Sequence, residues 1–253
     1  MTPRRRAGRP WRLWPLVLTG CFCLATPTAS AQSEVVASLQ PSFLPKTLGA
    51  RTAFTLGFRL KGGFEGVPPP VSRVVLRLPA GLAINLRDAA TCSGARLRRL
   101  GPAGCPARSL IGRGHSIAAV HAGSQSIPEQ AAVEAFRGPD RGGHPTVLIF
   151  ARGDTPLQQT TVSTGALAPD SGPYGLRLMV SVPPIPTLVY EPNASILSMS
   201  LTFGGVGGRP RAHAAAGTVT VPRRCPAGGF RFAASFVFTD GTTVSAAARV
   251  RCP

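Results

Sequence analysis

Several residue types are scarce in this 253-residue chain, and their scarcity narrows what the protein can be. Lysine occurs only twice, acidic residues number 10, and the two tryptophans, Trp11 and Trp14, both lie near the N-terminus. Proteins that bind single-stranded nucleic acid stack bases on aromatic side chains, and sugar sites commonly use the same device. The absence of tryptophan beyond the N-terminal region therefore argues against nucleic acid and against carbohydrate as ligands. No stretch after the N-terminal region reaches 18 apolar residues, so we predict no membrane-spanning helix there.

Motifs of familiar enzymes are also missing. The chain has no Gly-x-Ser-x-Gly elbow, no phosphate-binding loop and no dinucleotide fingerprint. Ser109, His115 and Asp88 supply the residue types of a catalytic triad, but any chain of this length offers such a set. The histidines lack zinc-site spacing: His115, His121, His144 and His213. We therefore expect no metal, no cofactor and no catalysis.

Positive charge is abundant, with a formal net charge of +18 carried almost entirely by arginine. Such an excess is typical of proteins with an anionic partner, such as an acidic polymer or a lipid surface. Coding bias is the alternative explanation, because Arg, Ala, Gly and Pro are all encoded by GC-rich codons and all are frequent here.

The N-terminus has the three parts of a secretory signal peptide. Residues 1–12 carry five arginines and no acid, residues 13–25 are apolar, and small residues occupy Ala29 and Ala31. We predict cleavage after Ala31, which places residues 32–253 in the cell envelope or outside the cell. Leu18-Thr19-Gly20-Cys21 resembles a lipobox, so a lipoprotein anchored at Cys21 is the alternative. The apolar residues after Cys21 favour ordinary cleavage.

Four cysteines remain after this cleavage, and an even number in an exported protein indicates disulfides. We predict the pairs Cys92–Cys105 and Cys225–Cys252, because each pair brackets a local unit of the sequence. Closing loops of this size stabilises the fold by about 3 kcal/mol each in the chain-entropy model.

Short runs with strand character recur along the chain, and turn residues separate them. This pattern predicts an all-β, antiparallel, disulfide-stabilised β-sandwich, immunoglobulin-like or jelly-roll-like, in one domain over residues 32–253. Two immunoglobulin-like modules divided near residue 123 are the alternative, although no linker-like segment lies there. A helical turn is predicted over 93–100, and strands near 34–40, 52–60, 71–78, 115–121, 130–136, 146–152, 159–165, 174–182, 194–203, 217–221, 229–238 and 242–251.

The last two predicted strands form a hairpin whose register can be predicted. Phenylalanine and alanine alternate with mostly polar residues over 230–238, and valine and alanine alternate with mostly polar residues over 243–250. A two-residue turn would set the apolar face of one strand opposite the polar face of the other. A three-residue loop with Gly241 in a left-handed conformation avoids this conflict. It places Phe236 opposite Val244 and Phe230 opposite Val250.

The first predicted disulfide encloses an arginine-rich loop. Arg96, Arg98 and Arg99 lie within it, and Arg108 follows closely. A crosslinked loop rich in arginine is a pre-ordered contact for anions. The alternative is a solvated loop in an arginine-biased protein.

Several phrases of the sequence resemble a loose group of uncharacterised secreted proteins from high-GC bacteria. They include Leu78-Pro79-Ala80-Gly81-Leu82, a stretch over 105–114, Cys225-Pro226-Ala227-Gly228-Gly229-Phe230 and the terminal Cys252-Pro253. The resemblance implies a β-sandwich and assigns no catalytic residue.

Together these features predict a secreted or envelope-associated, non-catalytic binding protein. Its expected partner is an anionic cell-wall polymer or lipid headgroup, met by the arginine-rich disulfide loop, and we expect no nucleic acid. The alternative is a secreted hydrolase of unfamiliar type.

Overall fold

A computed structural model describes residues 33–123, 125–204 and 218–253. The expected signal peptide, with Cys21, and most of the glycine-rich stretch over 204–210 lie outside these residues. Within the described ranges, no helix is long and apolar enough to cross a membrane.

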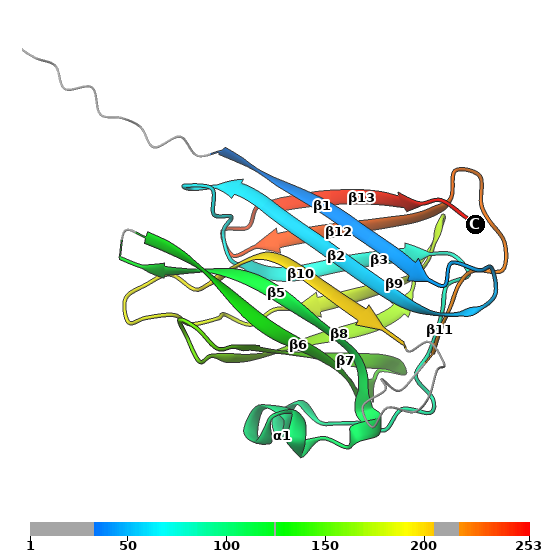
Figure 1. Ribbon diagram of the computed structural model, residues 1–253, viewed down its shortest axis with the longest axis horizontal. Coiled ribbons are helices and arrows are strands. Elements are labelled where there is room, and N and C mark those ends of the chain that lie inside the picture. The colour runs from blue at the N-terminus through cyan, green and yellow to red at the C-terminus, as the bar shows by residue number, and fades with distance from the viewer. Residues whose placement is uncertain (1–32, 124, 205–217) are drawn as a thin grey trace, which may run out of the picture. The chain divides into compact units, whose positions relative to one another are not determined.

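The described chain is built almost entirely from antiparallel strands (Figure 1). It also contains helix α1 (Gly94–Leu100) and two 3-10 turns, Pro102–Gly104 and Ala107–Ser109. The strands are β1 (Ser33–Leu44), β2 (Arg51–Gly63), β3 (Val71–Pro79), β4 (Ala83–Asn85), β5 (Leu110–Ala122), β6 (Gln125–Arg141), β7 (His144–Gly153), β8 (Thr160–Pro169), β9 (Tyr174–Ser181), β10 (Ser195–Phe203), β11 (Thr218–Thr220), β12 (Phe230–Phe238) and β13 (Thr243–Val250). The predicted all-β, antiparallel fold is confirmed, and so is the helical turn. The three-residue strand β4 was not predicted.

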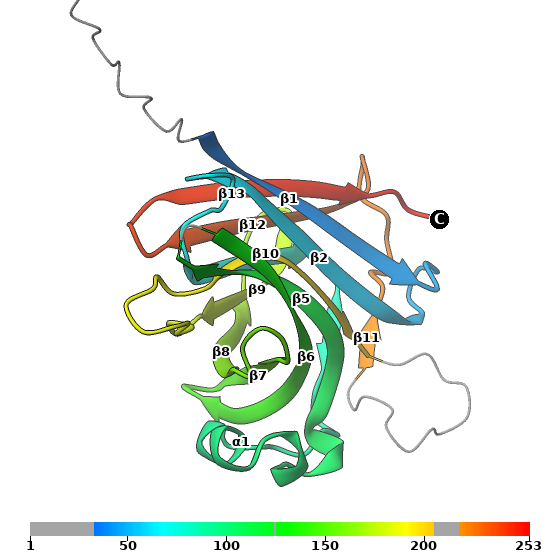
Figure 2. The same cartoon turned by 60° about the vertical axis from the view of Figure 1, so that its left-hand side comes forward.

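All of these strands belong to one sheet rather than to two separate ones. Its order is β13-β12-β3-β9-β8-β7-β6-β5-β10-β2-β11-β4, and β1 pairs with the remaining edge of β2. Strands from before and after residue 123 are interspersed in this order. The sheet curls, so that β5 to β8 wrap around beneath the layer formed by β1, β2, β12 and β13 (Figure 2). Register shifts in β5, β6 and β10 accompany this curvature, because a bulge bends the strand that carries it.

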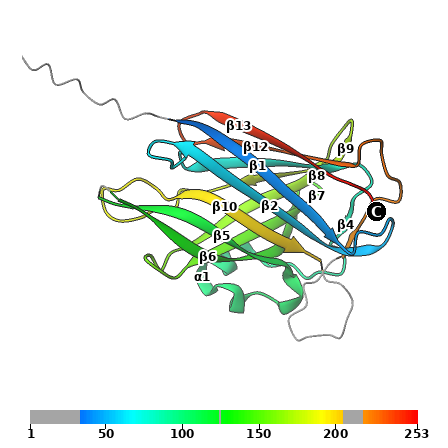
Figure 3. The ribbon, with the colours of Figure 1, turned by 45° about the horizontal axis from the view of Figure 1, so that its top comes forward.

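An aromatic core joins the two ends of the sheet order. Strands β1 and β2 pack against β12 and β13 (Figure 3), and alternate residues of each strand point inward. Phe54 stacks on Phe232 with ring centroids 5.7 Å apart, and Phe58 meets Phe236 at 4.9 Å. Phe43 contacts the same wall. These rings bring together β12 and β2, which lie near opposite ends of the sheet order.

The hairpin of β12 and β13 has the predicted register. Phe236 lies opposite Val244 and Phe230 opposite Val250, and Gly241 has a φ of 84°. The amide of Phe238 donates to the carbonyl of Thr242 at 2.9 Å, which closes a three-residue loop. The buried face therefore set the register here, as expected.

A second, smaller core lies on the outer face of the curled sheet. Helix α1 lies against this face (Figure 1). Its Leu97 is buried. Leu97 packs there with Cys92, Leu110, Phe136, Leu148, Phe150 and Val162. The first disulfide thus holds a rigid cap on the outside of β6 to β8.

Candidate functional site

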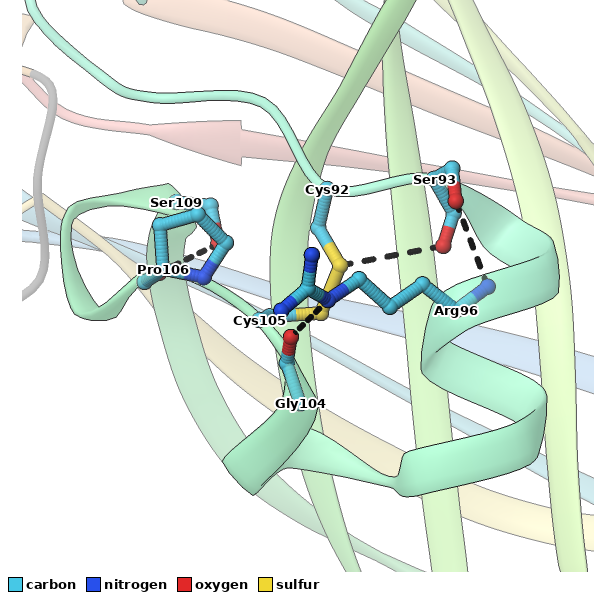
Figure 4. Close-up of a disulfide and its surroundings, with 7 residues drawn as sticks. All are labelled: Cys92, Ser93, Arg96, Gly104, Cys105, Pro106 and Ser109. Atoms are coloured by element: carbon cyan, nitrogen blue, oxygen red, sulfur yellow. Dashed lines mark hydrogen bonds between the residues drawn. A yellow bond between two sulfur atoms is a disulfide. The ribbon is translucent and has the colours of Figure 1, made fainter.

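Both predicted disulfides are confirmed. Cys92 and Cys105 are bonded with Cα atoms 5.4 Å apart, and Cys225 and Cys252 with Cα atoms 6.0 Å apart. Ser93 caps α1, since its hydroxyl accepts from the amide of Arg96 at 3.2 Å (Figure 4). Disulfides of this kind are typical of proteins that fold in an oxidising compartment.

The four arginines predicted to bind anions divide into two pairs. The side chain of Arg96 runs beside the disulfide and donates to the carbonyl of Gly104 (Figure 4). Arg108 donates to the carbonyl of Asp88 at 2.9 Å. These two side chains brace the loop. Arg98 and Arg99 are exposed in the last turn of α1, where cations are favourable.

A cleft of about 630 Å³ separates this cap from the outer face of β5 to β7. Its walls include residues 100–103 and two arginines from the sheet. Arg113 is paired with Glu134 at 3.2 Å, and Arg152 with Asp154 at 3.4 Å. Because each arginine in the cleft has a carboxylate beside it, the cleft offers little net charge to an anion.

A more strongly basic surface lies on the exposed face of β13, β12, β3 and β9. Arg249 lies directly opposite Arg231, and Arg77 lies directly opposite Arg177. Ala233 is opposite Arg77, so Arg231, two residues earlier, lies diagonal to Arg77. Opposite side chains have Cβ atoms about 4.5–5.5 Å apart, and diagonal neighbours are about 7–8 Å apart. We call Arg77, Arg177, Arg231 and Arg249 the arginine quartet.

One carboxylate accompanies the quartet among the described residues. Asp170 lies 3.5 Å from Nε of Arg77, whose guanidinium also lies over the ring of Tyr174, 5.7 Å from its centroid. Nε of Arg177 is buried and has no hydrogen-bond partner within the described chain. Like charges directly opposite in a sheet are destabilising. The quartet therefore has unsatisfied positive charge that an anion would relieve.

The end of the molecule closed by the second disulfide adds further basic side chains. Arg223 and Arg224 precede Cys225, Arg251 precedes Cys252, and all three are exposed. The disulfide ties these residues to the ends of β12 and β13, the strands that carry Arg231 and Arg249. The crosslinked end thus adds three exposed arginines near the ends of the strands that carry Arg231 and Arg249.

The residue types of a triad do not form an evident catalytic arrangement. Ser109 is fully buried, and its hydroxyl donates to the carbonyl of Pro106 at 2.6 Å. His115 is exposed on β5. In the described ranges, no three His, Cys, Asp or Glu side chains gather closely enough to hold a metal ion.

Sequence reasoning missed the quartet because its members come from distant parts of the chain. The local density of arginine in the first disulfide loop was visible, whereas the pairing of β3 with both β9 and β12 was not. The sequence did carry one sign of these residues, the alternation of polar and apolar side chains along each strand. Arg77 and Arg231 each lie on the polar face of a predicted strand. Comparisons with protein-family models, with curated proteins and with solved structures each found no match.

Proposed function

We propose that this protein is an exported, non-catalytic binding protein that attaches to an anionic polymer of the cell envelope through exposed arginines. The observation that carries the proposal is that two like-charged pairs occupy directly opposite register positions, Arg231 with Arg249 and Arg77 with Arg177. Two such pairs side by side cost stability unless an anion neutralises them.

The shape and chemistry of the face support this choice. Small side chains flank the quartet, including Ala233 and Ala247, which are opposite each other. The surface between the arginines is therefore low, and a polymer chain can approach it. Arginine binds carboxylate and phosphate in two-pronged geometry. A repeating anionic chain can meet several members of the quartet at once.

The arginine-rich loop remains a second contact surface within the same proposal. Arg98 and Arg99 are exposed there, and among the described residues they form no ion pair. Arg96 and Arg108 brace the loop, so charge reversal at those two positions would confuse binding with folding. The loop is therefore tested with Arg98 and Arg99 alone.

Retention on heparin and on isolated cell walls, measured at increasing salt, tests the proposal. The face variant is Arg231→Glu with Arg249→Glu, and the loop variant is Arg98→Glu with Arg99→Glu. A control with the same change in net charge is Arg59→Glu with Lys61→Glu, on the exposed face of β2. We expect wild-type retention to fall as salt rises, because exposed charges are screened.

The face variant should be released at the lowest salt, and the control should match the wild type. Equal losses in all three variants would mean that net charge alone is responsible, which contradicts a defined surface. A loss confined to the loop variant would move the site to the disulfide cap. Binding to anionic lipid vesicles without binding to walls would replace the polymer with a lipid headgroup.

A further inference from the structure

Among the described residues, Glu129 is an acidic residue buried inside the curled sheet. It lies on β6, is only 5% exposed and shares the inward face of the strand with Ala131 and Val133. Its Oε1 atom has no hydrogen-bond partner within the described chain. An unpaired buried polar group costs about 1–3 kcal/mol. A leucine or methionine at this position would avoid that cost, so the carboxyl group needs an explanation.

Glu129 lines a cavity of about 60 Å³ between β5, β6, β7, β8 and β10. The walls beside the carboxyl group are small residues, including Ala118, Ala131 and Ala151. Gly153 lies against the carboxyl group, and a methyl group there would displace Oε1 of Glu129 from its position. The site is therefore shaped around the carboxyl group and leaves room next to it.

Two further cavities continue from this one through the interior. The second, also about 60 Å³, shares Ile149, Ser163 and Met199 with the first. The third, about 30 Å³, shares Leu56 and Phe203 with the second. The second and third are lined almost entirely by apolar side chains. Because neighbouring cavities share lining residues, the three form a row of small spaces with Glu129 in the first, and we call this row the apolar path.

An exposed apolar loop tip stands beside the first cavity. Ile185 and Pro186 line the cavity, and Leu188, Val189 and Tyr190 follow them in the β9–β10 connection. Val189 is 80% exposed, and Tyr190 is fully exposed. Exposed apolar clusters mark sites that contact lipid or a partner.

Hydrogen bonds hold this tip in place. The hydroxyl of Thr187 donates to the carbonyl of Pro192 at 2.7 Å, and a carboxylate oxygen of Glu191 accepts from the amide of Gly123 at 2.8 Å. The side-chain amide of Gln159 donates to the carbonyl of Pro186 at 3.3 Å, which links the tip to the β7–β8 connection. The tip is therefore a defined surface at the cavity rather than a loose segment.

We propose that the interior binds one aliphatic chain whose hydroxyl head donates a hydrogen bond to Oε1 of Glu129, and that the tip at residues 188–190 is its entrance. The narrow path admits a single chain, and the unpaired acceptor selects a head group with a donor. The cavities are smaller than such a chain, so the proposal includes that they widen when the chain binds.

Burial raises the pKa of Glu129, Asp154 raises it further, and the backbone hydrogen bond with Leu157 opposes both. A carboxyl group that resists ionisation suits a neutral hydroxyl partner better than an anionic head group, which would repel any residual charge.

The probes are 1-decanol and decyl methyl ether, which differ in the hydroxyl donor, with binding measured by calorimetry. The wild type should bind the alcohol more tightly. Glu129→Met keeps the length of the side chain and removes the acceptor, and it should weaken alcohol binding about tenfold while leaving the ether unchanged. Ala131→Leu fills the first cavity and should abolish binding of both probes. The matched control is Ala132→Leu, on the exposed face of the same strand, which should bind as the wild type does.

Glu129→Met removes the unpaired Oε1 atom and also the hydrogen bond with the backbone of Leu157. Glu129→Gln, which keeps an acceptor for that bond, is the folding control, so a folding failure of Ala131→Leu would leave the test intact. The proposal is overturned if the wild type binds neither probe, or if Glu129→Met keeps the preference for the alcohol. A third variant, Val189→Ser with Tyr190→Ser, tests the entrance. It should bind free decanol normally but take it up more slowly from vesicles, and unchanged uptake would show that the tip is not the entrance.

Discussion

Replacing Arg249 by glutamate should stabilise the protein. The substitution converts a like-charged pair with Arg231 into an opposite-charged pair at the same register position. Opposite charges across strands contribute roughly 0.2–1 kcal/mol, and like charges are destabilising by a comparable amount. Arg249→Glu should therefore raise the free energy of unfolding by about 0.4–2 kcal/mol.

Urea denaturation followed by circular dichroism measures this change. At about 0.01 M salt the Debye length is about 30 Å, and at 1 M it is about 3 Å, so the gain should be large in the first condition and small in the second. Ser245→Glu is the matched control, since Ser245 lies opposite Ser235 on the same face of the same strands. It should give no comparable gain.

The same variant should lose retention on heparin, so stability and binding would change in opposite directions, as expected for a site whose charges serve a ligand. The reasoning is refuted if Arg249→Glu is no more stable than the wild type at low salt. It is equally refuted if the gain persists unchanged at 1 M salt, because a screened Coulomb interaction cannot produce that result.

Three further predictions concern the core, the second disulfide and the buried carboxyl group. Phe232→Ala should lower the free energy of unfolding by about 3–5 kcal/mol, because Phe232 is buried. Phe64→Ala, at an exposed ring, should lower it by about 0.5 kcal/mol or less. Chemical denaturation of both variants measures the difference. Replacing Cys225 and Cys252 together by serine should lower the free energy of unfolding by about 3–4 kcal/mol, since the disulfide links cysteines 27 residues apart. Calorimetry of the variant and the wild type, both without reductant, measures this loss. Finally, folding raises the pKa of Glu129 above its ordinary value of 4.5, so this group stabilises the fold below pH 4.5, and the stabilisation is lost as the pH rises through the pKa of the folded state. The melting temperature should therefore fall less with rising pH in Glu129→Gln than in the wild type. Parallel curves of melting temperature against pH would contradict this prediction.

Local patterns predicted most of the fold. Period-two alternation located the strands because each has one buried and one exposed face, and the same alternation fixed the β12–β13 register once the three-residue loop was recognised. The disulfides were predictable because each links cysteines around a compact unit. Strand β4 was missed because three residues, Ala83–Asn85, are too few to show any period.

The candidate sites were less predictable because they depend on which strands become neighbours. Arg77, Arg177 and Arg231 are separated in sequence, and their grouping follows from β3 lying between β9 and β12. Glu129 lay one residue before the predicted strand at 130–136. Extending the alternation of Ala131, Val133 and Ala135 back by one step would have placed it inside.

The position of β12 in the core has a consequence for the order in which the chain folds. Its phenylalanines form one wall, and the opposite wall comes from Phe43, Phe54 and Phe58 near the beginning of the described chain. A growing polypeptide cannot cover those early rings until its last two strands have been synthesised, and such distant partners meet slowly. Closure of the aromatic core therefore comes late in folding, after strands from both ends of the described chain have met.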